Sequence, residues 1–347
     1  MIKKKLEEYL DYKQPQPYIV SNEQYSNEYK TPVLTAGKSF LLGMTNDTKG
    51  IYPASKDEPI ILFDDFTTDI KWVDFPFKVK SSACKILVPR NDTNLRFCYY
   101  GMKSLNFDAS QHKRYWISQY SQMQLPDYPN ARKAEIVERL SRIENQINIK
   151  ENQLNKLDSL VKSRFIEMFG NPISEQKWIV KKWNDVLEIK NGKDYKKNLS
   201  DKENGYPVYG SGGFMNIYAD TYLCEGIITI IGRKGNINNP LLVEGKIWNV
   251  DTAFGIIVKS DILNPIFFHH CSKFYDYEKL NKATTIPSLT KSDLLNLEII
   301  MPPIELQDKF ADFVHLIDKS RFVVQKEIKD LQELLDSKMD EYFGGEE

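Results

Sequence analysis

The sequence predicts an α+β protein in which two mixed domains are joined by two long antiparallel coiled-coil helices, with an internal tandem repeat of about 174 residues. Three observations predict this fold. The middle of the chain and its end are almost alike, a heptad pattern precedes each of these segments, and short runs rich in Ile, Val and Phe fill the rest of both copies.

The repeat is clearest where RFIEMFG (164–170) aligns with KMDEYFG (338–344). The same shift places Pro129 on Pro303, and roughly forty residues align without a gap. Further upstream, KLEEYLDYK aligns with KWNDVLEIK, and TPVLTAGK with YPVYGSGG. The repeat therefore predicts a first mixed domain over 1–129, a first long helix over 130–170, a second mixed domain over 171–303 and a second long helix over 304–344.

Each predicted long helix carries apolar residues in alternating steps of three and four, and most other positions are Glu, Lys, Gln, Asn or Asp. Such a narrow apolar seam is typical of a coiled coil. Proline suits the first turn of a helix and glycine its C-terminal cap, which fits Pro129, Gly170, Pro303 and Gly344. About forty residues give a rod roughly 60 Å long. The seam consists of Leu140, Ile143, Ile147, Leu154, Leu157, Val161, Val314, Ile317, Val324, Ile328, Leu331 and Leu335, interrupted by Lys150, Arg164, Arg321 and Lys338.

The parts that precede these helices predict short strands. Runs such as PIILFDDF, GIITIIG and AFGIIVK are rich in Ile, Val and Phe and are bounded by Gly, Pro, Asn and Asp. Helical turns are expected to interrupt them, for example over 263–279. Each part is therefore predicted to be an α+β domain with a twisted, mostly antiparallel sheet.

Composition and charge exclude several classes of protein. Of the 347 residues, 41% are hydrophobic and 27% are charged, and no run approaches the ~18 apolar residues of a membrane span. No signal-peptide core follows the N-terminal lysines, so we expect a cytoplasmic protein without membrane contact. The four scattered cysteines predict free thiols. A net charge of −1 argues against a protein that coats nucleic acid indiscriminately, although basic faces can coexist with a neutral total.

Motifs of catalysis and metal binding are weak. His269, His270 and Cys271 are consecutive, so their side chains point in different directions and do not predict a metal site. GSGGF (210–214) lacks the Gly-Lys-Ser/Thr of a phosphate loop and predicts a tight turn. Neighbouring carboxylates such as Asp64 and Asp65 favour a solvated loop or a single hydrogen-bonding Asp over an acid-base pair. We therefore predict no catalytic residue, no bound metal and no cofactor on this chain.

Basic loops with aromatic neighbours are the better signal, and they indicate binding to double-stranded DNA. Lysines mainly hold phosphates, whereas Arg and Asn can pair bidentately with guanine and adenine edges. A solvated surface is the alternative for each loop taken alone. Where the two copies align, these loops share little sequence, as expected of modules that recognise different DNA sequences. The candidate DNA-binding residues are Lys38, Thr67, Thr68, Lys71, Lys78, His112, Lys113, Arg114 and Tyr115 in the first copy, and Lys193, Tyr195, Lys196, Lys197, Tyr209, Ser211, Arg233, Lys234 and Asn236 in the second.

Several stretches, together with the duplicated layout, resemble the DNA-specificity subunit of type I restriction-modification systems. They are LVKSRFIEMFGNP, LTKSDLLNLEIIMPPIELQDKF, IIGRKGNINNP with VDTAFGI, and PIILFDDFTTDIKWVDFPFKV. The resemblance implies two target-recognition domains, each of which reads one half of a bipartite DNA site, and two helices that set the unread spacer. It also implies two modification subunits, which bind S-adenosylmethionine and methylate adenine, and restriction subunits that use ATP and Mg²⁺.

Two other functions remain open from the sequence. A coiled-coil scaffold without DNA binding would explain the long helices but would give the basic loops no role. An enzyme that binds S-adenosylmethionine or a nucleotide at GSGG would bind that ligand as an isolated chain. The duplicated pattern and the basic aromatic loops favour the specificity subunit, a non-catalytic member of a methyltransferase and endonuclease complex.

Overall fold

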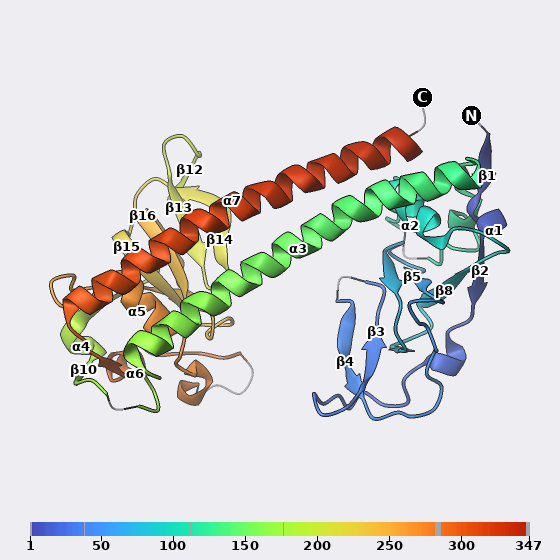
Figure 1. Cartoon of the computed structure of the whole chain (residues 1–347). Helices are drawn as coiled ribbons and strands as arrows, with labels where there is room; N and C mark the ends of the chain where they lie inside the picture. The colour runs from blue at the N-terminus through green and yellow to red at the C-terminus, as the bar shows by residue number, and fades with distance from the viewer. Residues whose placement is uncertain (1, 38, 112, 176, 282–285, 345–347) are drawn as a thin grey trace. The chain divides into compact units, whose positions relative to one another are not determined.

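The computed structural model describes residues 2–37, 39–111, 113–175, 177–281 and 286–344. Contacts divide the chain into two compact units. Unit 1 comprises Met1–Glu151 and Lys326–Glu347, and unit 2 comprises Asn152–Gln325. Two 40-residue helices, α3 (Asn130–Phe169) and α7 (Ile304–Phe343), contribute to both units, so each unit contains one mixed domain and part of each long helix (Figure 1).

Unit 1 contains a four-stranded sheet in the order β2-β8-β5-β6, a three-stranded sheet in the order β4-β3-β7, and the strand pair β1-β9. Neighbouring strands are antiparallel, except that β3 and β7 are parallel. The bounds are β1 Lys3–Lys5, α1 Leu6–Tyr9, β2 Leu10–Lys13, η1 Gln16–Tyr18, β3 Thr31–Leu34, β4 Leu41–Thr45, β5 Ile60–Asp64, β6 Ile70–Val73, β7 Lys78–Val79, β8 Cys84–Pro89, α2 Leu95–Ser104, η2 Tyr120–Gln122 and β9 Gln124–Pro126.

Strand β5 is the centre of unit 1, because both of its faces are buried. Ile61 and Phe63 belong to the core that includes α2 and the helix ends, whereas Ile60 and Leu62 belong to a second core beneath the smaller sheet. Successive residues of a strand point to opposite faces, so four consecutive apolar residues can serve both cores. This explains why the segment has no polar alternation.

Helix α2 attaches the sheet of unit 1 to α3. Its N-cap residue Asn94 accepts a hydrogen bond from the Phe97 amide at 3.1 Å. Glu144 of α3 accepts a hydrogen bond of 2.9 Å from the Tyr100 hydroxyl and forms ion pairs with Arg96 and Lys103 of α2. Burial opposes ionisation of Glu144, but these partners outweigh it and hold its pKa below the usual range.

Unit 2 contains a seven-stranded sheet in the order β11-β17-β15-β16-β13-β14-β12 and the strand pair β10-β18. Only β13 and β16 pair in parallel among these described strands. Helix α5 packs against β15, β16 and β17. The bounds are β10 Val180–Lys182, α4 Trp183–Val186, β11 Leu187–Asn191, β12 Leu199–Ser200, β13 Tyr206–Gly210, β14 Gly213–Ala219, β15 Cys224–Gly232, β16 Leu241–Asn249, β17 Ala253–Val258, α5 Pro265–Ser272, η3 Tyr277–Leu280, α6 Lys291–Leu295 and β18 Glu298–Ile300.

The core of unit 2 joins its sheet to the long helices through aromatic rings. The Phe165 ring of α3 lies 5.5 Å from the ring of Phe267 in α5 and 5.3 Å from that of Phe310 in α7. Gln307 of α7 is fully buried, and its side chain accepts a hydrogen bond from the Asn264 amide and donates one to the Pro302 carbonyl. These contacts fix the start of α7 against α5.

The two long helices run antiparallel within each unit. In unit 1 the Tyr128 hydroxyl, just before α3, donates to the carbonyl of Tyr342 near the end of α7, and Lys150 Nζ lies 2.7 Å from Glu327 Oε2. In unit 2 the ring of Phe169 lies 5.6 Å from that of Phe310, and Arg321 pairs with Asp158. All twelve apolar residues of the predicted seam are buried or half-buried. Helix α3 ends at Phe169, and Gly170, which follows it, takes a left-handed φ of 78° as the glycine cap requires.

Within the described part of the chain, no helix is long and apolar enough to cross a membrane.

Candidate nucleic-acid interface

In unit 1, the turn between β5 and β6 presents the two predicted threonines. Asp64 Oδ1 accepts hydrogen bonds from the amides of Phe66 and Thr67 at 2.9 and 3.0 Å. Thr68 takes a left-handed φ of 61°, and its amide donates to the Asp64 carbonyl. The turn is therefore fixed by its own hydrogen bonds, with the Thr67 side chain exposed.

Asp65, buried beneath this turn, holds a second predicted segment beside it. Its Oδ1 atom accepts a hydrogen bond of 2.8 Å from the Trp116 amide, and its carbonyl accepts one from the Tyr115 amide. Its Oδ2 atom lies 3.5 Å from Lys85 Nζ and 3.9 Å from Arg114 Nη1. The turn between β5 and β6 and the 113–116 segment therefore lie close together, although they are far apart in the sequence.

Lys113 and Arg114 are the basic side chains that this convergence places near the tip. Arg114 is about half exposed, its Nη2 atom donates to Ser82 Oγ at 3.1 Å, and its guanidinium lies 5.7 Å from the Phe66 ring. Lys113 is half-buried. Lys71 is also half-buried and lies on β6, cross-strand from Leu62. Lys38 and His112 lie outside the described residues.

Two of the predicted contact residues of unit 1 have buried side chains, which argues against their contact with DNA. The Lys78 side chain is 4% exposed, and its Nζ atom donates to the carbonyls of Lys49 and Gly50 and lies 3.4 Å from Asp47 Oδ2. Tyr115 is 1% exposed, and its hydroxyl donates to the Gln111 carbonyl. Both residues stabilise the fold and present no free polar group to DNA.

In unit 2, the turn between β16 and β17 is the point where the predicted loops meet. The amide of Lys193 donates to the Asn249 carbonyl, and the amides of Arg233 and Lys234 both donate to the Thr252 carbonyl. The Tyr209 carbonyl accepts a hydrogen bond of 3.0 Å from the Val250 amide. The side chains of Lys193, Arg233 and Lys234 are exposed. Three cations from two separate loops therefore surround one turn.

Two glycines make these close approaches possible. A Cβ atom at Gly192 would lie 1.8 Å from the Val250 carbonyl oxygen, so a side chain there would push Lys193 away from the turn. A Cβ atom at Gly232 would lie 2.0 Å from the Asn236 carbonyl oxygen and 3.1 Å from Ser211 Cβ. The loop after β15 therefore folds back on itself beside Ser211, with the side chain of Asn236 exposed.

The remaining predicted residues of unit 2 lie on a neighbouring turn. Lys196 and Lys197 are exposed, and the Lys196 amide donates to Asp194 Oδ1. Tyr195 is half-buried and packs against the cluster of Val208, Ala219, Trp248 and Val250, so part of its role is structural.

Sequence reasoning missed the buried residues that organise both loop clusters. Asn249 is fully buried, and its Nδ2 atom donates to the Ala253 carbonyl at 3.0 Å, which closes the β16-β17 turn. Lys85 is 2% exposed and faces Asp65. The sequence contained one signal for Lys85, because it is the single charged residue in the otherwise apolar run CKILVP.

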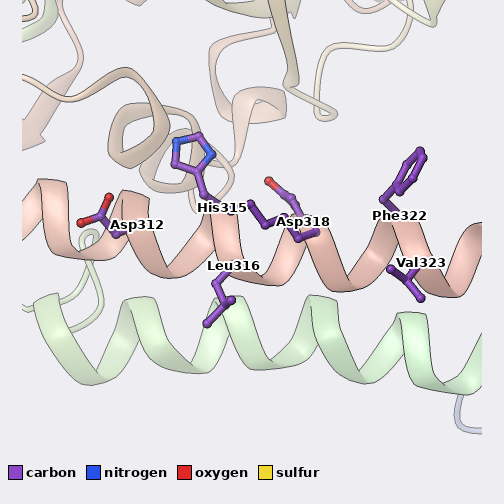
Figure 2. Close-up of a pocket in the computed structure, with 7 residues that line it drawn as sticks. Asp312, His315, Leu316, Asp318, Phe322 and Val323 are labelled. Carbon is purple, nitrogen blue, oxygen red and sulfur yellow. The ribbon is translucent and has the colours of Figure 1, made fainter.

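A further surface lies on α7, where large apolar side chains are exposed. Leu316, Phe322 and Val323 are 62%, 70% and 54% exposed. Together with Asp312, His315, Asp318 and Lys319 they line a shallow groove, and Figure 2 shows His315 and Phe322 projecting to the same side of the helix. We call these seven residues the α7 surface. Large apolar side chains gathered on an exposed helix are typical of a protein-protein contact.

No group of three or more His, Cys, Asp or Glu side chains within the described ranges is arranged to hold a metal ion. The cysteines are buried thiols. Burial raises the pKa of Cys98 and of Cys271 to about 12, which makes both poor nucleophiles.

Residues 175–333 match the model of the type I restriction modification DNA specificity domain. Over these residues, which are less than half of the chain, the sequence is similar to that family. The matched region contains β10 to β18 and most of α7.

A curated relative and two solved structures extend the likeness. The specificity subunit of the type I restriction enzyme EcoR124I/EcoR124II from Escherichia coli is 52% identical over 125 residues, which are 35% of this chain and 31% of that subunit. The match therefore spans less than a third of the relative's length. A crystal structure of a type I restriction-modification S subunit from M. genitalium aligns with a TM-score of 0.59 and 16% identity, covering 100% of this chain and 96% of that one.

A second solved structure, from work on complex assembly and conformational transition of the type I restriction-modification system, aligns with a TM-score of 0.52 and 12% identity, covering 96% of this chain and 97% of that one. At such low identity both structures show the fold alone. The predicted mixed α+β class is confirmed, and the predicted resemblance to type I specificity subunits is confirmed as well.

Proposed function

We propose that this chain is the sequence-specific DNA-binding subunit of a type I restriction-modification complex. In this proposal, the domains over 1–129 and 171–303 each read one half of a bipartite site in double-stranded DNA. The long helices over 130–170 and 304–344 join the two domains and dock modification subunits.

The observation that carries the proposal is that both units use one strand order but differ in their loops. The order β2-β8-β5-β6 of unit 1 corresponds to β11-β17-β15-β16 of unit 2, and each run follows a one-turn helix, α1 or α4. The loop that follows the central strand holds Thr67 and Thr68 in unit 1 but Arg233 and Lys234 in unit 2. A duplicated scaffold with unlike loops at equivalent places suits the reading of two different half-sites, and supports the internal repeat.

The residues we propose for DNA contact are those that the structure leaves accessible. Hydroxyl groups and cations serve phosphates, and Arg and Asn serve base edges. The set consists of Thr67, Thr68, Lys71, Lys113 and Arg114 in unit 1, and Lys193, Tyr195, Lys196, Lys197, Tyr209, Ser211, Arg233, Lys234 and Asn236 in unit 2.

The α7 surface supports docking of a modification subunit. Phe322 and Leu316 are too exposed to contribute to the unit 2 core, and large apolar anchors of this kind dominate protein interfaces. In the proposed complex, the modification subunits supply S-adenosylmethionine and adenine methylation, and restriction subunits supply ATP-dependent, Mg²⁺-dependent cleavage. The chain itself is proposed to bind none of these cofactors, to catalyse no reaction and to act in the cytoplasm.

The decisive experiment is single-molecule methylation sequencing of host DNA with the gene intact, deleted and carrying exchanged loops. We expect an interrupted adenine motif to lose methylation on deletion. Replacement of the loop over 232–239 should change only one half of that motif, and replacement of 66–69 only the other half. A matched replacement over 201–205, an exposed turn outside the proposed contacts, should leave both halves unchanged.

Two results would contradict the proposal. Motif halves that are unaffected by either loop exchange, in a chain that still supports methylation, would assign recognition to other residues. A purified complex that prefers no duplex over random sequence would favour the coiled-coil scaffold instead. Docking is tested separately: Phe322→Ser should release co-expressed modification subunits, whereas Leu199→Ser, which also alters an exposed apolar residue, should retain them.

A further inference from the structure

The hairpin of β13 and β14 exposes two large apolar side chains next to its two-residue turn. Phe214 is 44% exposed and Met215 is 39% exposed. Only Gly213 separates them from the turn of Ser211 and Gly212, since Gly210 pairs with Gly213 and Tyr209 pairs with Phe214. Neither residue is among the candidate DNA-binding residues predicted from the sequence, and neither has a role in the contacts proposed above.

The Phe214 ring is held in place by other rings although much of it is exposed. It lies 5.6 Å from the ring of Tyr209 across the strand pair and 5.6 Å from the ring of Tyr218 along its own strand. Tyr209 is itself tied to the β16-β17 turn through its backbone carbonyl. Ring contacts of this kind favour a defined orientation of the half-exposed Phe214 ring.

The hairpin tip lies among the cationic loops of unit 2. A Cβ atom at Gly213 would lie 3.9 Å from Leu241 Cδ1, at the end of the loop that carries Arg233 and Lys234. A Cβ atom at Gly210 would lie 3.6 Å from Val250 Cγ2, in the turn that binds the Lys193 amide. The apolar tip is therefore flanked on two sides by loops with exposed cations.

An apolar side chain at a phosphate-binding surface needs a partner that is both apolar and close to phosphates. The faces of stacked bases meet this requirement, and proteins that deform DNA insert Phe, Leu, Ile, Met or Pro between base steps. A protein partner that covered the tip would also have to accommodate three exposed cations. The charge around the tip therefore favours DNA as its occupant.

We propose that Phe214 is a wedge that enters a base step of the half-site bound by unit 2 and unstacks it. This inference rests on the proposed function and deepens it, since it adds DNA deformation to base contact. Sequence preference would then arise in part from how easily a step opens, at positions without a hydrogen bond to the protein.

The test uses the full chain, assembled with its modification subunits, and duplexes that carry the motif found by methylation sequencing. The probe is 2-aminopurine, a base whose fluorescence rises when it is unstacked. It replaces each base of the half-site in turn, except the adenine that becomes methylated. Wild-type protein should raise the fluorescence at one step. Phe214→Ala should abolish this rise and lower specific affinity by about tenfold, whereas Phe214→Leu should retain most of both.

Leu199→Ala is the matched control, because Leu199 is 57% exposed on β12 of the same sheet but outside the tip. It should leave fluorescence and affinity unchanged, and circular dichroism should show that all variants are folded. Specific binding with equal fluorescence in wild type and Phe214→Ala would overturn the wedge and leave the proposed function intact. Loss of modification subunits from Phe214→Ala would make the tip a protein contact and also overturn it. Binding without sequence preference in the wild type would refute both proposals.

Discussion

Asp65 Oδ1 accepts a hydrogen bond of 2.8 Å from the backbone amide of Trp116. This contact links the hairpin tip that presents Thr67 to the segment that carries Lys113 and Arg114. The same carboxylate lies 3.5 Å from Lys85 Nζ, and both side chains are almost fully buried. The position of the candidate interface of unit 1 thus depends on a buried group that cannot itself contact DNA.

Asp65→Ala is therefore expected to destabilise unit 1 by about 3–5 kcal/mol, because it leaves the buried Lys85 cation without its carboxylate. Asp65→Asn should cost less, since an amide oxygen can still accept the Trp116 hydrogen bond. Hydrogen exchange resolved by peptide distinguishes unit 1 from unit 2 in the full chain. Equal protection of unit 1 in the wild type and in Asp65→Ala would contradict this account.

Lys78→Met is expected to weaken folding rather than DNA binding. The side chain is buried, donates to two carbonyls and faces Asp47, so its loss removes the Lys78 hydrogen bonds to both carbonyls and the cation beside Asp47. We expect a loss of about 2–4 kcal/mol in unit 1. The control is Lys80→Met, which removes a surface pair with the exposed Glu23 and should change little. If Lys78→Met lowered the affinity for DNA and left stability unchanged, Lys78 would be a DNA contact after all.

Some of these features could be predicted from the sequence and others could not. The long helices were predictable because a seam such as Val314, Ile317 and Val324 is local and periodic. Lys78 and Tyr115 were placed at the interface because basic and aromatic residues near a turn look alike whether they point outward or inward. Their burial depends on contacts with Asp47 and Gln111, which a linear pattern does not contain.

The convergence of the candidate interface is another property that a linear pattern does not contain. Lys193 and Arg233 meet at one turn only because β11 pairs with β17, and β17 with β15. This strand order was not predicted, so the loops could be named but not assembled. Phe214 was missed for a related reason: an apolar residue in a strand is usually buried, and only the register places it at the exposed end of a hairpin.

His269 is expected to make unit 2 sensitive to acid. It is 4% exposed, and its Nδ1 atom has no hydrogen-bond partner among the described residues. Burial, with a smaller contribution from the nearby Lys273 and His270, lowers its pKa to about 2. A histidine whose folded pKa is depressed binds its proton mainly in the unfolded state, so it contributes full stability above an unfolded pKa of about 6.5. That stability is lost as the pH falls toward 2.

The expected slope from this one group is about 1.4 kcal/mol per pH unit below pH 6. His269→Leu should remove that slope and fill the same apolar site without losing a hydrogen bond. Urea unfolding of unit 2, followed between pH 7 and pH 4 by hydrogen exchange, provides the measurement. His315→Leu is the control, because this exposed histidine lies outside the core and should leave the slope as it is. An identical slope in His269→Leu and wild type would show that His269 is protonated in the folded unit.

Replacements of Arg233 and of Lys193 are expected to affect DNA binding in different ways. Both are exposed beside the β16-β17 turn, but only Arg233 can pair bidentately with a base edge. Lys193→Ala should weaken binding to all duplexes alike and reduce the dependence of log affinity on log salt by about one. Arg233→Lys keeps the charge, so the salt dependence should persist while discrimination at one base pair falls by about 1–3 kcal/mol.

These effects can be separated by anisotropy titrations at several salt concentrations. The titrations use the cognate duplex and each single-base variant of the unit 2 half-site. Glu225→Ala, an exposed substitution at the opposite end of β15, provides the baseline. If Arg233→Lys lowered affinity uniformly and left discrimination intact, Arg233 would be a phosphate contact. Base reading in unit 2 would then have to come from Asn236 or from Phe214 at the tip of the β13-β14 hairpin. The same titrations on Asn236→Ala would decide between them.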